Sequence, residues 1–309
     1  MLNRWRFLVV TLFTYCLTVE RVSTWLIRSG EPVQQRTEFP FIAFLTTERT
    51  MCTGSLVSTR AVLTAGHCVC SPLPVVRVSF LTLRNGDQQG IHHQPSGVVV
   101  APGYMPSCMS ARQRRPIKQT LSGFDIAIVS LAQLVNLQTG IRVLSLPQPT
   151  DIPRPGTPVF IVGYGRDDND RDPQRKNGGI LKKGRATIME CRHATNGDPI
   201  CVKSGQNFGQ LPAPGDSGGP LLPSPQGPVL GVVSHGVTLP NLPDIIVEYA
   251  SVARMLDFMI FIVDQFLHLT TLVNASTFVE IYRCDQNNHN HVSNIFTIIL
   301  LLLLRSSVK

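Results

Sequence analysis

The stretch "LPAPGDSGGPLL", residues 211–222, places a single hydroxyl, that of Ser217, beside the carboxyl group of Asp216. Three glycines surround this hydroxyl: Gly215, Gly218 and Gly219. Glycine lets a backbone turn tightly without steric cost, so the serine is set in a flexible, sharply turning segment. A lone serine hydroxyl is a weak nucleophile at neutral pH and needs a neighbouring base. The function of this stretch therefore depends on whether the rest of the chain supplies that base.

The composition favours a folded, strand-rich chain. Of 309 residues 43% are apolar and only 16% are charged, which excludes bulk disorder. The 24 Gly and 23 Pro are typical of short strands joined by many turns. Strand-like runs, most with Gly or Pro near their ends, cover residues 39–45, 54–65, 75–83, 97–101, 125–131, 157–165, 184–190, 228–236 and 245–252. The pattern predicts an all-β barrel or sandwich.

One helix and two charged loops complete this pattern. The helix is indicated by an apolar stripe at three- and four-residue spacing: Val252, Met255, Leu256, Met259, Val263 and Phe266. We expect it to pack against the domain and close it. Residues 108–119 are basic and residues 165–184 carry both signs of charge. We interpret both as solvated loops, the alternative being that they flank a cleft and steer substrates.

The chain contains the parts that acyl transfer by serine needs. A base takes the hydroxyl proton, an acidic group orients that base, and backbone N–H groups stabilise the oxyanion. His67 in "LTAGHC" and Asp125 in "GFDIAIVSL" precede Ser217 in "GDSGGP". The same groups follow other orders in subtilisins and α/β-hydrolases. Over about residues 27–266 the chain resembles the chymotrypsin-type serine proteases.

This resemblance implies an architecture and a division of the chain. The fold would be all-β, with two six-stranded antiparallel β-barrels of chymotrypsin type and a C-terminal helix. Residues 1–26 would be a signal peptide and short pro-segment, and residues 27–268 the protease domain. Residues 269–309 would form a C-terminal tail with a short apolar end.

The resemblance also implies the role of each site residue. His67 would be the general base and then the general acid, and Asp125 would hold its imidazole in the correct tautomer. Ser217 would be the nucleophile, and the N–H groups of Gly215 and Ser217 would form the oxyanion hole. Ser234, in "VVSHG", would border the substrate strand and support Asp125.

Substrate preference follows from the positions that match the family's specificity pocket. Its floor falls at Leu211, where trypsin-like members carry an aspartate, so cleavage after Lys or Arg is not expected. Gly236 would leave one wall open to a side chain, and Val247 would narrow the pocket from the opposite wall. We predict a preference for apolar residues. His235 replaces an aromatic residue common at its position, so the adjoining groove is expected to differ.

Activation in this family begins with a cut that creates a new N-terminus. Here Ile27 stands at that position, and its α-amino group would pair with the carboxylate of Asp216. The preceding residue is Leu26 rather than Lys or Arg. A trypsin-like activator would cut after Arg28 instead, and the bond after Leu26 would need a protease of another specificity.

The chain has eight cysteines. By resemblance Cys52 would pair with Cys68, and Cys191 with Cys201. Cys70 and Cys108 remain in the catalytic half, and we expect a third bridge between them, the alternative being two free thiols. Free thiols are uncommon in secreted proteins.

The two ends carry processing signals. The basic start and apolar residues 7–19 predict a signal peptide and secretion rather than a membrane anchor. Apolar residues 295–304 would span only about half of the ~30 Å hydrocarbon core of a bilayer. We therefore favour a secreted, extracellular protein over one attached through its tail. Asn274 begins a glycosylation sequon.

These observations lead to a secreted serine endopeptidase that acts on protein or peptide substrates. An activating protease and protease inhibitors would be its other partners. The net charge of +8 is not gathered in a basic helix with aromatics, so nucleic acid is not expected. No cofactor is expected, and the histidines lack the spacing of a metal site. The alternative function is that of a catalytically silent homologue that binds partners.

Overall fold

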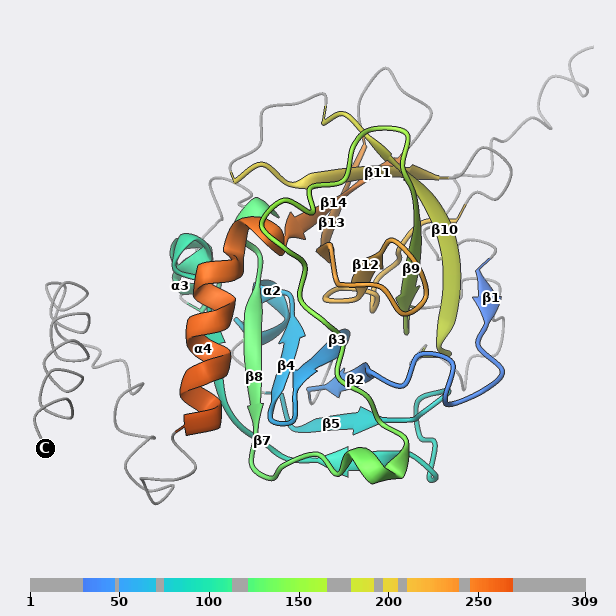
Figure 1. Ribbon diagram of the computed structural model, residues 1–309, viewed down its shortest axis with the longest axis vertical. Helices are drawn as coiled ribbons and strands as arrows, with labels where there is room; N and C mark the ends of the chain where they lie inside the picture. The colour runs from blue at the N-terminus through green and yellow to red at the C-terminus, as the bar shows by residue number, and fades with distance from the viewer. Residues whose placement is uncertain are drawn as a thin grey trace, which may run out of the picture. The chain divides into compact units, whose positions relative to one another are not determined.

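The structure is a computed structural model that describes residues 30–47, 50–70, 75–112, 122–165, 179–191, 197–204, 210–238 and 245–268. Residues 1–267 form one compact unit and residues 268–309 a second. All strands described below belong to the first unit, and they form two antiparallel sheets (Figure 1).

The C-terminal sheet closes on itself. Its strand order is β1 (Glu31–Pro32), β10 (Lys182–Met189), β11 (Ile200–Ser204), β14 (Ile245–Ser251), β13 (Gly231–Thr238), β12 (Pro220–Leu222) and β9 (Pro158–Gly163). Because β9 also pairs with β10, six of these strands form a barrel, and β1 is added at its edge. Its buried cluster is built from apolar residues such as Ile161, Val202 and Tyr249.

The N-terminal sheet is curled. Its order is β6 (Ile91–His93), β5 (Arg77–Phe80), β2 (Ile42–Thr46), β3 (Met51–Ser58), β4 (Ala61–Thr64), β8 (Ala127–Leu131) and β7 (Pro95–Val100). The edge strands β6 and β7 are separated in the chain only by Gln94, yet no ladder joins them among the described residues. The sheet therefore curls until the chain itself, rather than a hydrogen-bonded pair, connects its two edges.

The predicted mostly β architecture with a closing helix is confirmed. It differs from two closed six-stranded barrels in the half-barrel form of the N-terminal sheet. The helix α4 (Leu256–His268) follows a 3-10 turn, η5 (Ala253–Met255), and buries Leu256 and Met259. None of the helices that the structure describes is long and apolar enough to cross a bilayer.

The prediction that residues 108–119 form a solvated loop was wrong in part. The basic segment 108–119 was expected to be irregular, but its first residues belong to the helix α3 (Met105–Arg112), which follows η1 (Pro102–Tyr104). Cys108 is buried there in a small cluster with Tyr104 and Cys70. Tertiary packing therefore overrides the polar local sequence. Residues 113–119, like most of the second charged segment 165–184, lie outside the described residues.

A seam between the two sheets is bridged by hydrogen bonds centred on Thr53 of β3. Its backbone N–H donates to the carbonyl of Ser217 at 2.8 Å, and its Oγ1 donates to the carbonyl of Gly215 at 2.9 Å. The backbone N–H of Tyr164 donates to the same Oγ1 at 3.1 Å. Thr53 is fully buried. The backbone and the side chain of Thr53 therefore both tie the segment that carries Ser217 to the N-terminal sheet.

Candidate active site

His67 and Asp125 are brought together by two elements of the N-terminal half. His67 lies in the short helix α2 (Gly66–Val69), directly after β4, and Asp125 lies between η2 (Ser122–Phe124) and β8. The Asp125 Oδ2 is 2.7 Å from the His67 Nδ1, and Oδ1 accepts the His67 backbone N–H at 2.8 Å. The imidazole and its peptide group are thus held by one carboxylate.

The electrostatics of this pair suit a base and its counter-ion. Burial lowers the pKa of His67, but the charge of Asp125 and its hydrogen bond outweigh burial and raise that pKa above 6.5. Burial raises the pKa of Asp125, but the charge of His67 and the hydrogen bonds from His67 and Ser234 lower it overall. The pair therefore favours an ionised carboxylate beside a ring that readily accepts a proton.

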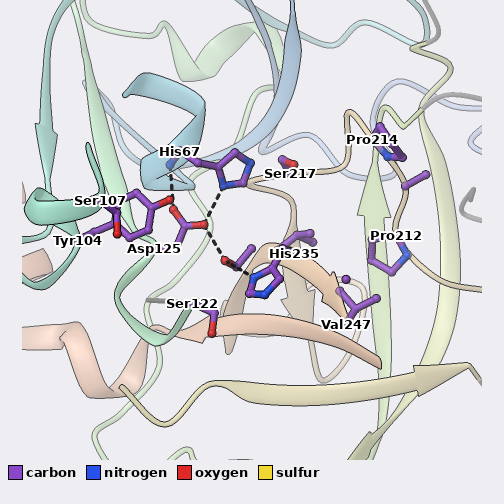
Figure 2. Close-up of a pocket in the computed structure, with 14 residues that line it drawn as sticks. His67, Tyr104, Ser107, Ser122, Asp125, Pro212, Pro214, Ser217, His235 and Val247 are labelled. Atoms are coloured by element: carbon purple, nitrogen blue, oxygen red, sulfur yellow. Dashed lines mark hydrogen bonds and ion pairs between the residues drawn. The ribbon is translucent and has the colours of Figure 1, made fainter. Parts of the chain in front are cut away.

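Ser217 lies at the edge of the same cavity, on the side of the His67 ring opposite Asp125 (Figure 2). Its segment turns at Gly215, whose φ of +105° is a conformation that L side chains rarely adopt. Within the part of the chain that the structure describes, the backbone N–H groups of Gly215 and Ser217 donate to no acceptor. Two donors therefore remain available next to the hydroxyl.

Ser234 and His235 extend the polar cluster along β13. The Ser234 Oγ donates to the Asp125 Oδ2 at 2.6 Å. The His235 Nδ1 lies 3.4 Å from that Oγ, and its Nε2 lies 3.2 Å from the Glu248 Oε2 on β14. The Glu248 side chain is 1% exposed. A second histidine–carboxylate pair thus adjoins the first one.

These residues line a cavity of about 550 Å³ (Figure 2). Its polar members are His67, Ser107, Ser122, Asp125, Ser217, Ser234 and His235. The remaining lining residues are Tyr104, Pro212, Ala213, Pro214, Val233, Gly236 and Val247. The cavity therefore combines a nucleophile and a base with a largely apolar wall, an arrangement suited to an apolar side chain next to a reacting carbonyl.

The structure brings most of the specificity residues to this cavity. Ser234, Gly236 and Val247 are among its lining residues, and Leu211 is not. Leu211 is 9% exposed and belongs to the apolar core cluster of the C-terminal barrel, which also holds Val247. Its neighbours in sequence, Pro212, Ala213 and Pro214, line the cavity.

Asp216 points away from the cavity and into the protein. Its carboxylate accepts the backbone N–H groups of Ala213 and Gly165, each at 2.7 Å. Burial raises the pKa of Asp216 to about 7, against the lowering effect of those two N–H groups and of the charge of Lys182. A carboxylate that is so poorly stabilised would gain from another cation.

Three disulfides are present among the described cysteines: Cys52–Cys68, Cys70–Cys108 and Cys191–Cys201. The first closes over the two strands before His67, and the second joins the end of α2 to α3. Both thus fix the surroundings of the histidine. The sulfurs of Cys52 and Cys68 lie within 4.8 Å of His67, as in a metal site, but the bridge leaves neither as a thiolate ligand.

Several predicted residues cannot be placed. Ile27, Asn274, the signal segment 1–26 and the tail 269–309 lie outside the described residues.

A model of the trypsin family, described as "Trypsin", matches residues 27–258. The chain belongs to the trypsin family. This confirms the predicted membership of the chymotrypsin-like group. It also confirms the predicted enzyme class, since this trypsin-family chain is a serine-type endopeptidase that acts on protein substrates.

The relatives of the trypsin-family chain agree with its assignment as a serine endopeptidase. It is 92% identical over 260 residues to "Cercarial protease" of Schistosoma mansoni, which covers 84% of this chain and 98% of that protein. It is 29% identical over 207 residues to human chymotrypsin-like elastase family member 3A, covering 60% of this chain and 66% of that one. Among solved structures it is similar to human heparin binding protein, with a TM-score of 0.58 and 21% identity over 77% of this chain and 96% of that one. The last likeness supports the fold.

Sequence reasoning missed two residues whose side chains contact residues of the site, Thr53 and Glu248. Glu248 did carry a signal, since it is an acidic residue within the apolar strand "IIVEYAS". Thr53 carried none, because its role depends on a contact between two sheets.

Proposed function

We propose that this endopeptidase hydrolyses peptide bonds through an acyl-enzyme formed on Ser217. His67 takes the proton of the Ser217 hydroxyl as that oxygen attacks the substrate carbonyl, and later gives it to the leaving amine. Asp125 holds the ring and stabilises the imidazolium. The observation that carries the proposal is the pair of hydrogen bonds from His67 to Asp125 at 2.7 and 2.8 Å, with Ser217 at the same cavity.

The experiment for this proposal is labelling with a fluorophosphonate probe, which reacts only with an activated serine. The mature protein is expected to be labelled, and Ser217→Ala to lose the label. Ser224→Ala, which changes an exposed serine outside the site, is the matched control and is expected to keep it. A mature protein that folds but is not labelled would show a catalytically silent chain.

The oxyanion that forms during attack is proposed to bind to the backbone N–H groups of Gly215 and Ser217. The support is that both groups lie next to the hydroxyl with no acceptor among the described residues. Each such donor is typically worth about 3–4 kcal/mol in the transition state. The positive φ of Gly215 predicts that Gly215→Ala lowers kcat more than it weakens substrate binding.

Cleavage is proposed to follow apolar residues. The support is the cavity wall formed by Pro212, Ala213, Pro214 and Val247. Among the described residues that line the cavity, the carboxylate is that of Asp125, which is paired with His67. A peptide panel that varies only the residue before the scissile bond tests this. Leu, Phe or Met is expected to exceed Lys or Arg in kcat/KM, and the reverse order would contradict the proposal.

Activation is proposed to require a new N-terminus at Ile27. Its α-amino group would add a second cation to the influence of Lys182 on Asp216, and so stabilise the segment that carries Gly215 and Ser217. An activating protease with apolar specificity would make the cut after Leu26. Sequencing the N-terminus of the active protein decides between Ile27 and Ser29.

The remaining proposals concern secretion, glycosylation and inhibition of the protein. Residues 1–26 would direct secretion, residues 27–268 form the protease, and the tail 269–309 would carry a glycan on Asn274. Protease inhibitors would bind at the same cavity as substrates. The three disulfides support an oxidising compartment. A change in mobility after glycosidase treatment, absent in Asn274→Gln, tests the glycan.

A further inference from the structure

A buried cation lies in the C-terminal barrel and has no part in the reaction described so far. Lys182 of β10 is 8% exposed, and among the described residues it is the one buried Lys or Arg. A lysine is rarely buried unless an opposite charge or hydrogen bonds compensate for the loss of water. The burial of Lys182 therefore indicates an anion inside the protein.

The sheet register gives the direction in which the Lys182 side chain leaves β10. Lys182 lies directly opposite Gly163 of the neighbouring antiparallel strand β9 (Figure 1). Side chains directly opposite each other on such strands stand on the same face of the sheet. At Gly163 that face is occupied by Asp216, because a Cβ added there would collide with the Asp216 Oδ1. The Lys182 side chain therefore leaves the sheet on the face against which the Asp216 carboxylate packs.

Asp216 is an anion that this cation can stabilise. It is buried, and its carboxylate accepts the backbone N–H groups of Ala213 and Gly165. Burial raises the pKa of Asp216 to about 7, while the two N–H groups and the charge of Lys182 act to lower it. Lys182 thus supplies part of the opposite charge that a buried carboxylate needs.

The next residue along β10, Lys183, is a lysine with a different environment. Successive side chains of a strand point to opposite faces, so Lys183 leaves the sheet on the other side. It pairs there with Glu38, and the two side chains are 31% and 29% exposed. Two adjacent lysines therefore differ in burial and in the anion that they face, and the second can serve as a control for the first.

The position of Asp216 governs the two N–H groups of the proposed oxyanion hole, because it lies between Gly215 and Ser217 in sequence. The carbonyl of Gly215 accepts from the Thr53 Oγ1 at 2.9 Å, and that of Ser217 accepts from the Thr53 backbone N–H at 2.8 Å. The three-residue segment is thus held at both of these carbonyls and at the carboxylate between them. A cation that keeps this carboxylate in place helps to keep the two N–H groups in place as well.

We propose that Lys182 is a positioning residue, a built-in counter-ion that holds Asp216 before the chain is cut. The inference rests on the proposed function, in which a new α-amino group at Ile27 completes the charge pairing of Asp216. The uncut chain then has a low endopeptidase activity, and the cut raises an activity that already exists. Because Lys182 acts through the oxyanion donors, its charge affects kcat more than KM.

The experiment compares Lys182→Met in the uncut and the mature protein. The uncut protein carries Leu26→Pro and Arg28→Gln, which block both candidate cuts, and its intact mass confirms that it is whole. At about pH 8 a carboxyl group with a pKa of about 7 is mostly ionised, so the uncut protein is expected to cleave a peptide with Leu before the scissile bond. Lys182→Met should lower this kcat about tenfold, the worth of one hydrogen bond to a charged group. In the mature protein the fall should be smaller, because the α-amino group replaces the lost charge.

Three further variants separate charge from packing. Lys182→Arg keeps the charge and is expected to restore part of the kcat of the uncut protein. Lys183→Met removes the adjacent lysine, which pairs with Glu38, and is the matched control that should leave kcat unchanged in both forms. If Lys182→Met does not fold, Lys182→Gln keeps a hydrogen-bonding end without the charge and carries the same expectation.

Two results would overturn this inference and leave the proposed function intact. The first is an uncut protein with neither activity nor fluorophosphonate label beside a mature protein that has both. The second is an equal fall in kcat in the two forms of Lys182→Met, which would make Lys182 a structural residue only. A mature protein without activity would instead refute the proposed function, and this inference would fall with it.

Discussion

Three hydrogen bonds converge on Asp125, two from His67 and one from Ser234. Because Asp125 is 2% exposed, solvent contributes little to stabilising its charge. The donors therefore keep it ionised, and its charge in turn raises the pKa of His67. Charge, orientation and basicity at this site are thus consequences of one buried carboxylate.

Replacing that carboxylate is expected to change both the rate and its pH dependence. Asp125→Asn should lower kcat by about 10⁴-fold near neutral pH, the loss known for triads of this kind. Because the charge of Asp125 raises the pKa of His67 above 6.5, the neutral base forms at higher pH in the unchanged enzyme than in the variant. The acid limb of the kcat profile should therefore move to lower pH, and an unmoved limb would contradict this origin of the shift.

Asp216 makes a different prediction, for stability in the uncut chain. Its pKa is raised from 3.8 to about 7, so between these values the unfolded chain releases this proton and the folded chain retains it. The free energy of unfolding therefore falls as pH rises through that window, and this contribution is absent in Asp216→Asn. Urea unfolding of both proteins from pH 4 to pH 8 measures the difference. Equal slopes in the two proteins would exclude a raised pKa.

Among the secondary-structure elements, the sequence predicts where strands lie better than it predicts which strands pair with one another. Apolar runs with turn residues at their ends identify nine strand-rich segments, because burial leaves a mark in composition. The short strands β1, β6, β11 and β12 leave no such mark and were not predicted. Helix α3 was hidden by polar residues, since its packing depends on the bridge from Cys108 to Cys70.

The residues of the site divide in the same way, into those that local motifs predict and those that depend on contacts between strands. The motifs around His67, Asp125 and Ser217 are local, and the resemblance to a family gave their roles. The contacts of Thr53 and Glu248 depend on which residue lies across a seam or on the neighbouring strand. Those partners are set by sheet register and by the register shift of β13 at Ser234, which periodicity in one sequence does not specify.

The bridge that anchors α3 is expected to matter for binding as well as stability. The double variant Cys70→Ser, Cys108→Ser should lose about 2–4 kcal/mol of unfolding free energy. It should also raise KM, because Tyr104 of the same buried cluster lines the cavity. Chemical unfolding and steady-state kinetics measure the two effects.

The matched control for this prediction is Cys191→Ser, Cys201→Ser. Its bridge closes a loop of 10 residues, and neither cysteine lines the cavity. It should lower stability and leave KM unchanged. An equal rise of KM in both double variants would refute a specific role for the Cys70–Cys108 bridge.

In the molecule as a whole, the reactive groups belong to different halves. His67 and Asp125 come from the N-terminal sheet, and Ser217 precedes β12 of the C-terminal barrel. Besides the bonds of Thr53, the Tyr164 hydroxyl donates to the carbonyl of Thr82 across the seam at 2.8 Å. Catalysis therefore requires that the two halves stay docked.

Thr53→Val tests this requirement with almost no change of volume. It leaves the carbonyl of Gly215 and the N–H of Tyr164 without their buried partner, which should cost about 1–3 kcal/mol for each group. We expect kcat to fall and activity to be lost at a lower temperature than in the unchanged enzyme. Thr47→Val, at an exposed turn, is the control and should behave normally. A variant with unchanged activity would show that the seam does not depend on Thr53.

The placement of the three bridges has a consequence for recovery after damage. Each closes within one half, so none of them crosses the seam, and the segment between β8 and β9 keeps the halves on one chain. If mild heating separates the halves while each remains oxidised and folded, they meet again as parts of a single molecule. The return of activity on cooling should then follow first-order kinetics whose rate does not depend on protein concentration.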